Sequence, residues 1–301
     1  MIDKILSYLD ENKDQHVKEL CEYLSIPSIS SIPAHDNDII EAARFTHKAF
    51  EAIGLASEII ETDGHPLVYA QSEQLPDRKT LLFYGHYDVQ PVDPIELWES
   101  PPFEPRIENE IIYARGGSDD KGQLYTHIKA LEAYVKLGIE VPVNVKFIIE
   151  GEEEAGGEEI YKFTESNPEK LACDAVIVSD TSLYNEETPA ICYSLKGLAY
   201  MQIDVKGPGM DLHSGSFGGT VQNPGNVICE IISRLKDGSG RVQIPGFYDS
   251  VLELDDAEKA SFESLNYSDA VLCKDTGASG PFGEEGFTTL EEIAYVPIEE
   301  M

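Results

Sequence analysis

Three short apolar segments, each followed at once by polar side chains, constrain the fold of this chain more than any other feature. They cover residues 80–84, 143–149 and 174–178, and they lead into Gly85-His86-Tyr87-Asp88, Glu150-Gly-Glu-Glu-Glu154 and Ser179-Asp180. A helix expected from about Lys121 to Leu137 separates the first two segments. Strands that alternate with helices indicate an α/β sheet covered on both faces, and ligands of such sheets bind beyond the carboxyl ends of the strands. The sequence therefore predicts a site where His, Glu and Asp side chains meet.

The remaining elements are predicted from apolar periodicity and from the positions of glycine and proline. Helical spacing runs from Ile2 to Leu24, and the other expected elements are helices at about 38–53, 158–166 and 226–235 and strands at about 56–61, 67–71 and 199–206. Loops rich in glycine begin after Leu195, which places a domain boundary near Lys196. We therefore expect a first domain over residues 1–195 and a second over residues 196–301.

Carboxylates are concentrated at the end of the second apolar segment. Glu150, Glu152, Glu153 and Glu154 place four acids within five residues, and such groups repel one another unless water or a cation separates them. A solvated acidic loop is the simpler interpretation of this run by itself. The apolar strand just before it favours a position at the edge of the sheet.

His86 with Asp88, and Asp119 with Asp120, each have an ordinary explanation when they are taken alone. The first pair matches a hydrogen-bonded histidine at a strand end, and the second matches the N-cap of a helix. Together with Asp180 and the glutamates, however, these residues offer nitrogen and oxygen ligands without cysteine. That ligand set is typical of a hydrolytic zinc, manganese or cobalt site.

Five motifs in order along the chain resemble the family of carnosine and nonspecific dipeptidases, acetylornithine deacetylases, succinyl-diaminopimelate desuccinylases and glutamate carboxypeptidases. The motifs are FYGHYDVQPVD (83–93), YARGGSDDKG (113–122), EGEEEAGG (150–157), VIVSD (176–180) and DLHSGSFGG (211–219). The doubled Asp119-Asp120 is most similar to the dipeptidase branch. The resemblance implies a dinuclear zinc peptidase whose mixed sheet is flanked by helices, with an inserted α+β lid and dimerisation domain.

The resemblance also implies a set of metal ligands by matching position. His86, Asp119, Glu154 and Asp180 are implied as ligands of two divalent metal ions, which are zinc or else manganese or cobalt. Asp119 is implied as the carboxylate that bridges the two ions.

Three further residues receive catalytic roles from the resemblance. Glu153 is implied as the general base, which takes a proton from a metal-activated water and passes it to the departing amine. Asp88 is implied as the carboxylate partner of His86. His213 is implied as a lid residue that reaches the site of the partner subunit in a homodimer and helps to hold the oxyanion. These roles imply hydrolysis of the peptide bond of dipeptides or small peptides.

The chain departs from the family pattern in one respect. The family carries a further histidine ligand late in its catalytic domain, and no histidine follows His213 here. We therefore expect a catalytic domain that is incomplete at its C-terminus, and weak or absent activity for residues 1–301 alone. Two alternatives stay open at this point: a deacylase of N-acyl amino acids, and a non-catalytic homologue that dimerises.

The charge balance excludes some partners. The chain holds 22 Lys and Arg residues against 56 Asp and Glu residues, which gives a formal net charge of −34. Such a surface repels nucleic acid and anionic membranes, and a saline habitat is one explanation for it. The N-terminus lacks a signal-peptide pattern, no apolar run reaches the ~20 residues of a membrane span, and no CxxC pair occurs. We therefore expect a cytoplasmic protein.

Overall fold

The computed structural model describes the chain except for residues 182, 186–187, 189, 193–197, 295–297 and 301. The chain divides into two compact units, Met1–Pro189 and Ala190–Met301. The predicted boundary at residues 195–196 lies outside the described residues, so the limits of the two domains stay a prediction. In the described part of the chain, no helix combines the length and the apolar character needed to cross a bilayer.

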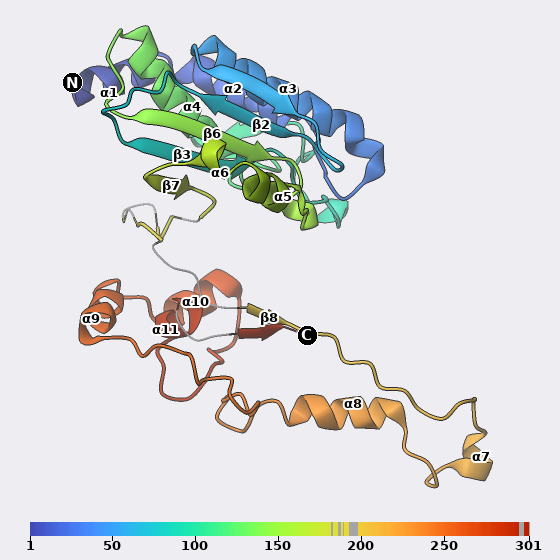
Figure 1. Cartoon of the computed structure of the whole chain (residues 1–301). Helices are drawn as coiled ribbons and strands as arrows, with labels where there is room; N and C mark the ends of the chain where they lie inside the picture. Colours follow the sequence, from blue (N-terminus) through green and yellow to red (C-terminus); the bar gives the residue numbers. More distant parts are fainter. Residues whose placement is uncertain (182, 186–187, 189, 193–197, 295–297, 301) are drawn as a thin grey trace. The chain divides into compact units, whose positions relative to one another are not determined.

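A five-stranded mixed sheet forms the centre of the first unit (Figure 1). In spatial order its strands are β1 (Ala56–Ile60), β2 (Leu67–Gln71), β6 (Asn144–Glu150), β3 (Thr80–His86) and β7 (Ala175–Val178). Both β6 and β7 run parallel to β3, whereas the β1–β2 and β2–β6 pairs are antiparallel. The expected α/β fold is confirmed, and the carboxyl ends of the three predicted strands lie at the same end of the sheet.

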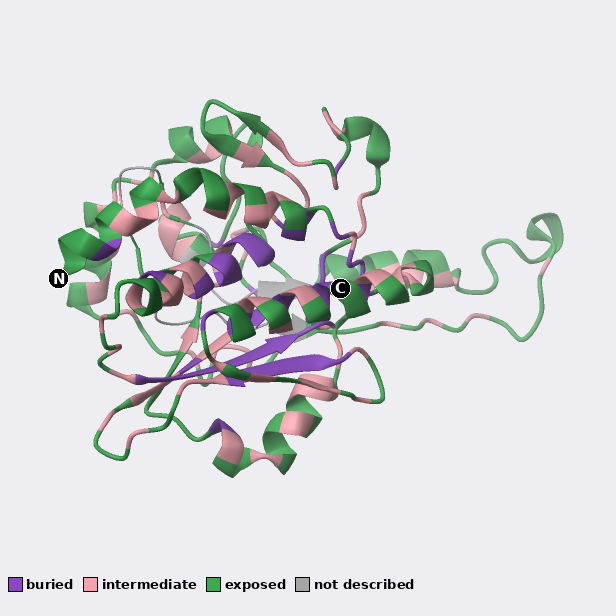
Figure 2. Cartoon of the chain, turned by 90° about the horizontal axis from the view of Figure 1, so that it is seen from above, coloured by how far each residue is buried: buried purple, intermediate pink, exposed green. Residues whose placement is uncertain are grey.

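Helices cover both faces of this sheet (Figure 1). One layer consists of α1 (Ile2–Glu11), α2 (Lys13–Leu24), α3 (Asp36–Ala52) and α4 (Lys121–Lys136), and the other of α5 (Glu159–Ser166) and α6 (Pro168–Leu171). The larger core joins the first layer to Phe147, and a smaller core joins Leu171 of α6 to Ile148. Because β6 lies between the two cores, all seven of its residues are buried. Figure 2 shows this burial along the central strands.

The helical pattern from Ile2 to Leu24 forms two helices rather than one. The chain leaves helical geometry at Asn12, where φ is −107° and ψ is 9°. The side chain of Asn12 donates to the main-chain oxygen of Tyr8 at 2.8 Å. Asparagine competes in this way with the backbone hydrogen bonds of a helix, which explains the break.

Short elements complete the first unit. They are the 3₁₀ turns η1 (Pro33–His35), η2 (Ile95–Leu97) and η3 (Glu153–Ala155) and the hairpin strands β4 (Arg106–Glu108) and β5 (Ile111–Tyr113). The turn η3 follows β6 directly and carries two of the candidate site residues.

The described residues of the second unit form short helices and one two-stranded sheet. Its elements are β8 (Leu198–Tyr200), α7 (Ser214–Phe217), α8 (Pro224–Ser233), α9 (Asp256–Ser264), α10 (Asp269–Thr276), α11 (Thr289–Ala294) and β9 (Ile298–Glu300). The strand predicted over residues 199–206 is wrong beyond Tyr200. A strand needs a hydrogen-bonded neighbour, and β9 pairs in parallel with residues 198–200 alone.

Candidate metal centre

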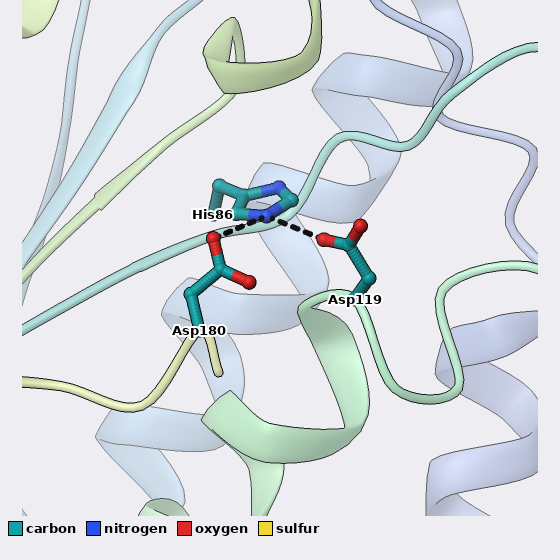
Figure 3. Close-up of side chains that lie close together, drawn as sticks. All are labelled: His86, Asp119 and Asp180. Atoms are coloured by element: carbon teal, nitrogen blue, oxygen red, sulfur yellow. Dashed lines mark hydrogen bonds and ion pairs between the residues drawn. The ribbon is translucent and has the colours of Figure 1, made fainter. Parts of the chain in front are cut away.

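His86 occupies the C-terminal end of β3 and is fully buried. Its Nδ1 atom donates to the main-chain oxygen of Asp88 at 3.1 Å and lies 3.3 Å from Asp88 Oδ1. This orientation leaves Nε2 as the acceptor atom of the neutral ring. Nε2 faces Asp119 Oδ1 at 3.0 Å and Asp180 Oδ2 at 3.6 Å (Figure 3).

Three side chains from separate parts of the fold converge here. His86 comes from β3, Asp119 from the loop before α4, and Asp180 from the loop after β7. Each offers one ligand atom, and the three atoms lie within 4.8 Å of one another. The predicted meeting of strand ends thus holds for His86 and Asp180, Asp119 joins them from the loop before α4, and no glutamate belongs to this group.

The charges of this group call for a proton or a cation between the side chains. Burial by itself would lower the pKa of His86, but the hydrogen bond and charge of Asp88, with Asp120 and Asp180, outweigh burial and raise this pKa to about 10. Burial raises the pKa of Asp180. Protonation of Nε2 is one way to relieve the repulsion between its lone pair and two carboxylates. A divalent cation bound to the same atoms is the other, so the donor set fits a metal ion.

Asp120 supports His86 from within the core, a role that the sequence did not reveal. Its Oδ2 atom accepts the main-chain N–H of His86 at 3.2 Å, and the residue is 2 % exposed. A Cβ atom at Gly85 would lie 2.7 Å from this oxygen, so glycine permits the close approach. Burial raises the pKa of Asp120 to about 7. Asp120 occupies the N-cap position of α4, but its side chain makes no capping hydrogen bond.

Asp88 connects His86 to the acidic loop (residues 151–157). The carboxylate is fully buried, and its Oδ2 atom accepts the main-chain N–H of Glu154 at 3.0 Å. Asp88 thus faces the His86 ring and fixes the turn η3 at the same time. Its predicted place beside His86 agrees with this geometry.

The predicted ligand Glu154 and the predicted base Glu153 lie on η3. Glu154 is not in the three-residue group, and its Oε2 atom accepts a hydrogen bond from Gln90 Nε2 at 2.6 Å. Burial raises the pKa of both glutamates, and the charge of Asp119 adds to this effect. Both carboxylates thus respond to the charges of the group, while their roles as base and ligand stay predictions.

Two further buried groups make contacts that the sequence did not reveal. Glu150 accepts from the hydroxyl of Tyr84 at 2.7 Å, and burial raises its pKa to about 7. Lys121 is fully buried and donates to the main-chain oxygen of Ile26 at 2.7 Å, which joins the start of α4 to the end of α2. The available signal was position, because Glu150 lies within the motif of residues 150–157 and Lys121 within that of residues 113–122.

A pocket of about 620 Å³ opens beside the three-residue group. Its lining includes Asp119, Asp180, Gln123 and Leu20. His213, the remaining predicted site residue, belongs to the second unit, where it is exposed and precedes α7. Its predicted role stays a prediction.

The fold and this group of ligand atoms define a candidate metal centre at one end of an α/β sheet. The sequence model described as peptidase family M20/M25/M40 matches residues 82–283. The chain belongs to this family, which confirms the resemblance drawn from the five motifs.

Curated relatives include dipeptidases. The chain is 35 % identical over 290 residues to the Cys-Gly metallodipeptidase dug1 of Schizosaccharomyces pombe, which covers 92 % of this chain and 61 % of that protein. It is 30 % identical over 289 residues to the human Beta-Ala-His dipeptidase, and this alignment covers 88 % of this chain and 55 % of that protein. The chain thus spans about three fifths of the length of these relatives.

Solved structures share the fold. The di-peptidase Dug1p of Saccharomyces cerevisiae matches with a TM-score of 0.76 and 27 % identity, over 95 % of this chain and 63 % of that chain. The M20 family metallo-carboxypeptidase Sso-CP2 of Sulfolobus solfataricus matches with a TM-score of 0.75 and 38 % identity, over 92 % of this chain and 62 % of that chain.

Proposed function

We propose that this chain carries the metal-binding and proton-transferring residues of a metal-dependent dipeptidase. The observation that carries the proposal is the orientation of His86. Its Nδ1 atom is engaged by Asp88, and its Nε2 atom faces Asp119 and Asp180. Membership of peptidase family M20/M25/M40 and the metallodipeptidases among the relatives support the same conclusion.

His86, Asp119, Asp180 and Glu154 would hold two divalent metal ions, zinc in the first instance. Such ions supply a Lewis acid that polarises the scissile carbonyl and makes water more acidic. Glu154 would have to exchange its hydrogen bond with Gln90 for a metal bond. Asp88 keeps the His86 ring in the orientation that exposes Nε2, which is the usual function of a carboxylate behind a histidine ligand.

Glu153 is the proposed general base. It lies on η3 with part of its side chain open to solvent. Partial burial, together with Asp180 and other nearby acids, raises its pKa, which makes the carboxylate a better proton acceptor. Glu153 takes the proton of the attacking water and delivers it to the amine that departs. His213 would stabilise the oxyanion.

The test is hydrolysis of a substrate panel by the purified 301-residue chain. The names of the relatives suggest Cys-Gly and β-Ala-His as the first dipeptides, and N-acetyl amino acids test the deacylase alternative. We expect weak cleavage of dipeptides or none from residues 1–301 alone, and any cleavage should require added zinc, manganese or cobalt and stop with EDTA. We expect Glu153→Gln to lower kcat by about 10²–10⁴-fold while zinc binding persists.

The zinc titration separates the remaining outcomes. His86→Ala is expected to abolish zinc binding, whereas the distant His47→Ala is expected to leave it unchanged. Zinc binding without any cleavage would support the metal centre and agree with the weak or absent activity expected for residues 1–301 alone, whereas full turnover would contradict that expectation. Absence of zinc binding by the unsubstituted chain would overturn the proposal.

We also propose a cytoplasmic homodimer that forms through residues 196–301. The support is the family resemblance, in which this domain carries His213 to the partner subunit. Light scattering of the purified chain would measure its mass against 33.3 kDa for one copy. A monomer at all concentrations would contradict the dimer.

A further inference from the structure

Glu152 contacts a loop that lies outside the metal centre. Its Oε1 atom accepts the main-chain N–H of His65 at 2.8 Å. His65 belongs to the β1–β2 loop (residues 61–66), and its ring Nε2 contacts the main-chain oxygen of Ser30 at 3.0 Å. Glu152 therefore joins the acidic loop to a loop that is itself attached to the segment between α2 and α3.

Two glycines leave the space that the Glu152 carboxylate occupies. A Cβ atom at Gly64 would overlap Oε1 of Glu152, and a Cβ atom at Gly157 would overlap Oε2. Neither glycine has a positive φ, so space rather than backbone conformation accounts for the absence of a side chain. The carboxylate thus lies between two segments, one on each side.

The main chain of Glu152 is fixed as well. Its carbonyl oxygen accepts the N–H groups of Ala155 at 3.1 Å and of Gly157 at 2.9 Å. These bonds close the turn η3, which starts at the next residue. Asp88 holds the same turn through the N–H of Glu154. The positions from which Glu153 and Glu154 leave the backbone therefore depend on two carboxylates, Asp88 and Glu152.

We propose that Glu152 is a positioning residue that fixes the acidic loop against the β1–β2 loop and so directs Glu153 and Glu154 toward the metal centre. The proposal rests on the function proposed above for those two glutamates. The contact with His65 uses one acceptor oxygen, which an amide also provides. The Glu152→Gln variant should therefore retain the contact with His65, whereas the Glu152→Ala variant should lose it.

The experiment compares three variants of the full chain with two controls. Glu152→Ala removes the contact, Glu152→Gln keeps the acceptor, and Gly64→Ala displaces the carboxylate while all acids remain. Glu165→Ala removes one exposed charge from α5, and Gly238→Ala adds a methyl group where no atom lies within 4 Å.

Amide hydrogen exchange is the first measurement. We expect Glu152→Ala and Gly64→Ala to speed exchange at His65, Ala155 and Gly157 about tenfold, the factor for loss of one hydrogen bond. Glu152→Gln and both controls should exchange like the unsubstituted chain. Zinc titration is the second measurement, and the same two variants should bind zinc about tenfold more weakly.

Unchanged exchange in Glu152→Ala and Gly64→Ala would overturn the proposal. Faster exchange throughout the first unit, with a lower melting temperature in Glu152→Ala and no rescue by Glu152→Gln, would show a general structural role and would also overturn it. If the unsubstituted chain binds no zinc, the proposed function fails, and the exchange rates alone decide whether Glu152 fixes the loop.

Discussion

The two units of this chain differ in how they exclude water. The first unit buries two apolar clusters on opposite faces of its sheet. Among the side chains described in the second unit, Val242 is the one buried apolar group and Glu284 the one buried charged group. Since apolar burial is the main source of folding free energy, the first unit has its own basis for cooperative folding. The second unit depends more on polar contacts.

The largest expected effect comes from the core of the first unit. Phe147 is fully buried between Phe50 and Phe83, with ring centroids at 4.6 Å and 4.9 Å. Phe147→Ala should lower the free energy of unfolding by about 3–5 kcal/mol. Urea unfolding followed by fluorescence of Trp98, the single tryptophan of the chain, reports this loss. Hydrogen exchange in the Phe147→Ala variant tests the contrast between the units. If exchange became faster by the same factor in the second unit as in the first, the two units would unfold together, and the proposed difference in their stability would be wrong.

In the second unit, a network of polar side chains should provide much of the stabilisation. Glu284 accepts from Arg241 Nη1 at 2.6 Å and from the Tyr248 hydroxyl at 2.5 Å. Glu284→Ala should cost about 1–3 kcal/mol, because two donors lose their acceptor. Exchange of amides near these residues measures the loss, with the exposed Glu285→Ala as the matched control. If Glu284→Ala and Glu285→Ala changed amide exchange equally, the hydrogen bonds of Glu284 would not stabilise the second unit.

Acid should weaken a polar contact that joins the helices of the first unit. Burial tends to raise the pKa of Glu19, but hydrogen bonds from Gln15, Lys129 and Tyr125 outweigh it and lower this pKa to about 2. Because the folded pKa lies below the unfolded value of about 4.3, this stabilisation is present above pH ~4.3 and is lost as the pH falls toward 2. Glu19→Gln should therefore cost about 1–2 kcal/mol at pH 7 and less at pH 3.

Urea midpoints at the two pH values, read from the Trp98 signal, measure that difference. The exposed Glu11→Gln provides a control with the same change of charge. A gap between Glu19→Gln and the unsubstituted chain that stays constant from pH 7 to pH 3 would contradict the assigned pKa direction.

The smallest effect is expected from an exposed phenylalanine of the second unit. Phe282 is 88 % exposed. Phe282→Ala should change the free energy of unfolding by less than about 0.5 kcal/mol, because no buried contact is lost. The same substitution, Phe→Ala, is thus expected to cost far less free energy of unfolding at Phe282 than at Phe147. A large destabilisation by Phe282→Ala would reveal an apolar contact in the second unit.

The sequence predicted the first unit better than the second for a physical reason. Each of the strands β3, β6 and β7 comes from a short apolar run, and polar residues mark the point where each run ends; β6 is buried along its whole length, β3 is partly buried and β7 is largely exposed. The strand expected over residues 199–206 had no such support. Its alternation depends on a neighbouring strand, and β9 extends only from Ile298 to Glu300.

The grouping of His86, Asp119 and Asp180 could be predicted, whereas the contacts around it could not, and the roles of the site residues stay predictions. His86 and Asp180 meet because β3 and β7 are neighbouring parallel strands, and Asp119 joins them from the loop before α4. The hydrogen bond of Glu154 to Gln90 and the burial of Asp120 depend on side-chain packing between distant segments, which no local pattern records. The contact between Glu152 and His65 is of the same kind.

The position of β7 links ion binding at the metal centre to the stability of the sheet. Among the described strands, β7 pairs with β3 alone, and Asp180 follows it by two residues. Strands at the margin of a sheet open more readily than central ones, and opening would carry Asp180 away from His86. A bound ion must oppose that opening by RT ln(1 + [L]/Kd). The protection of the Val176–Val178 amides therefore becomes a measure of ion affinity that requires no substrate.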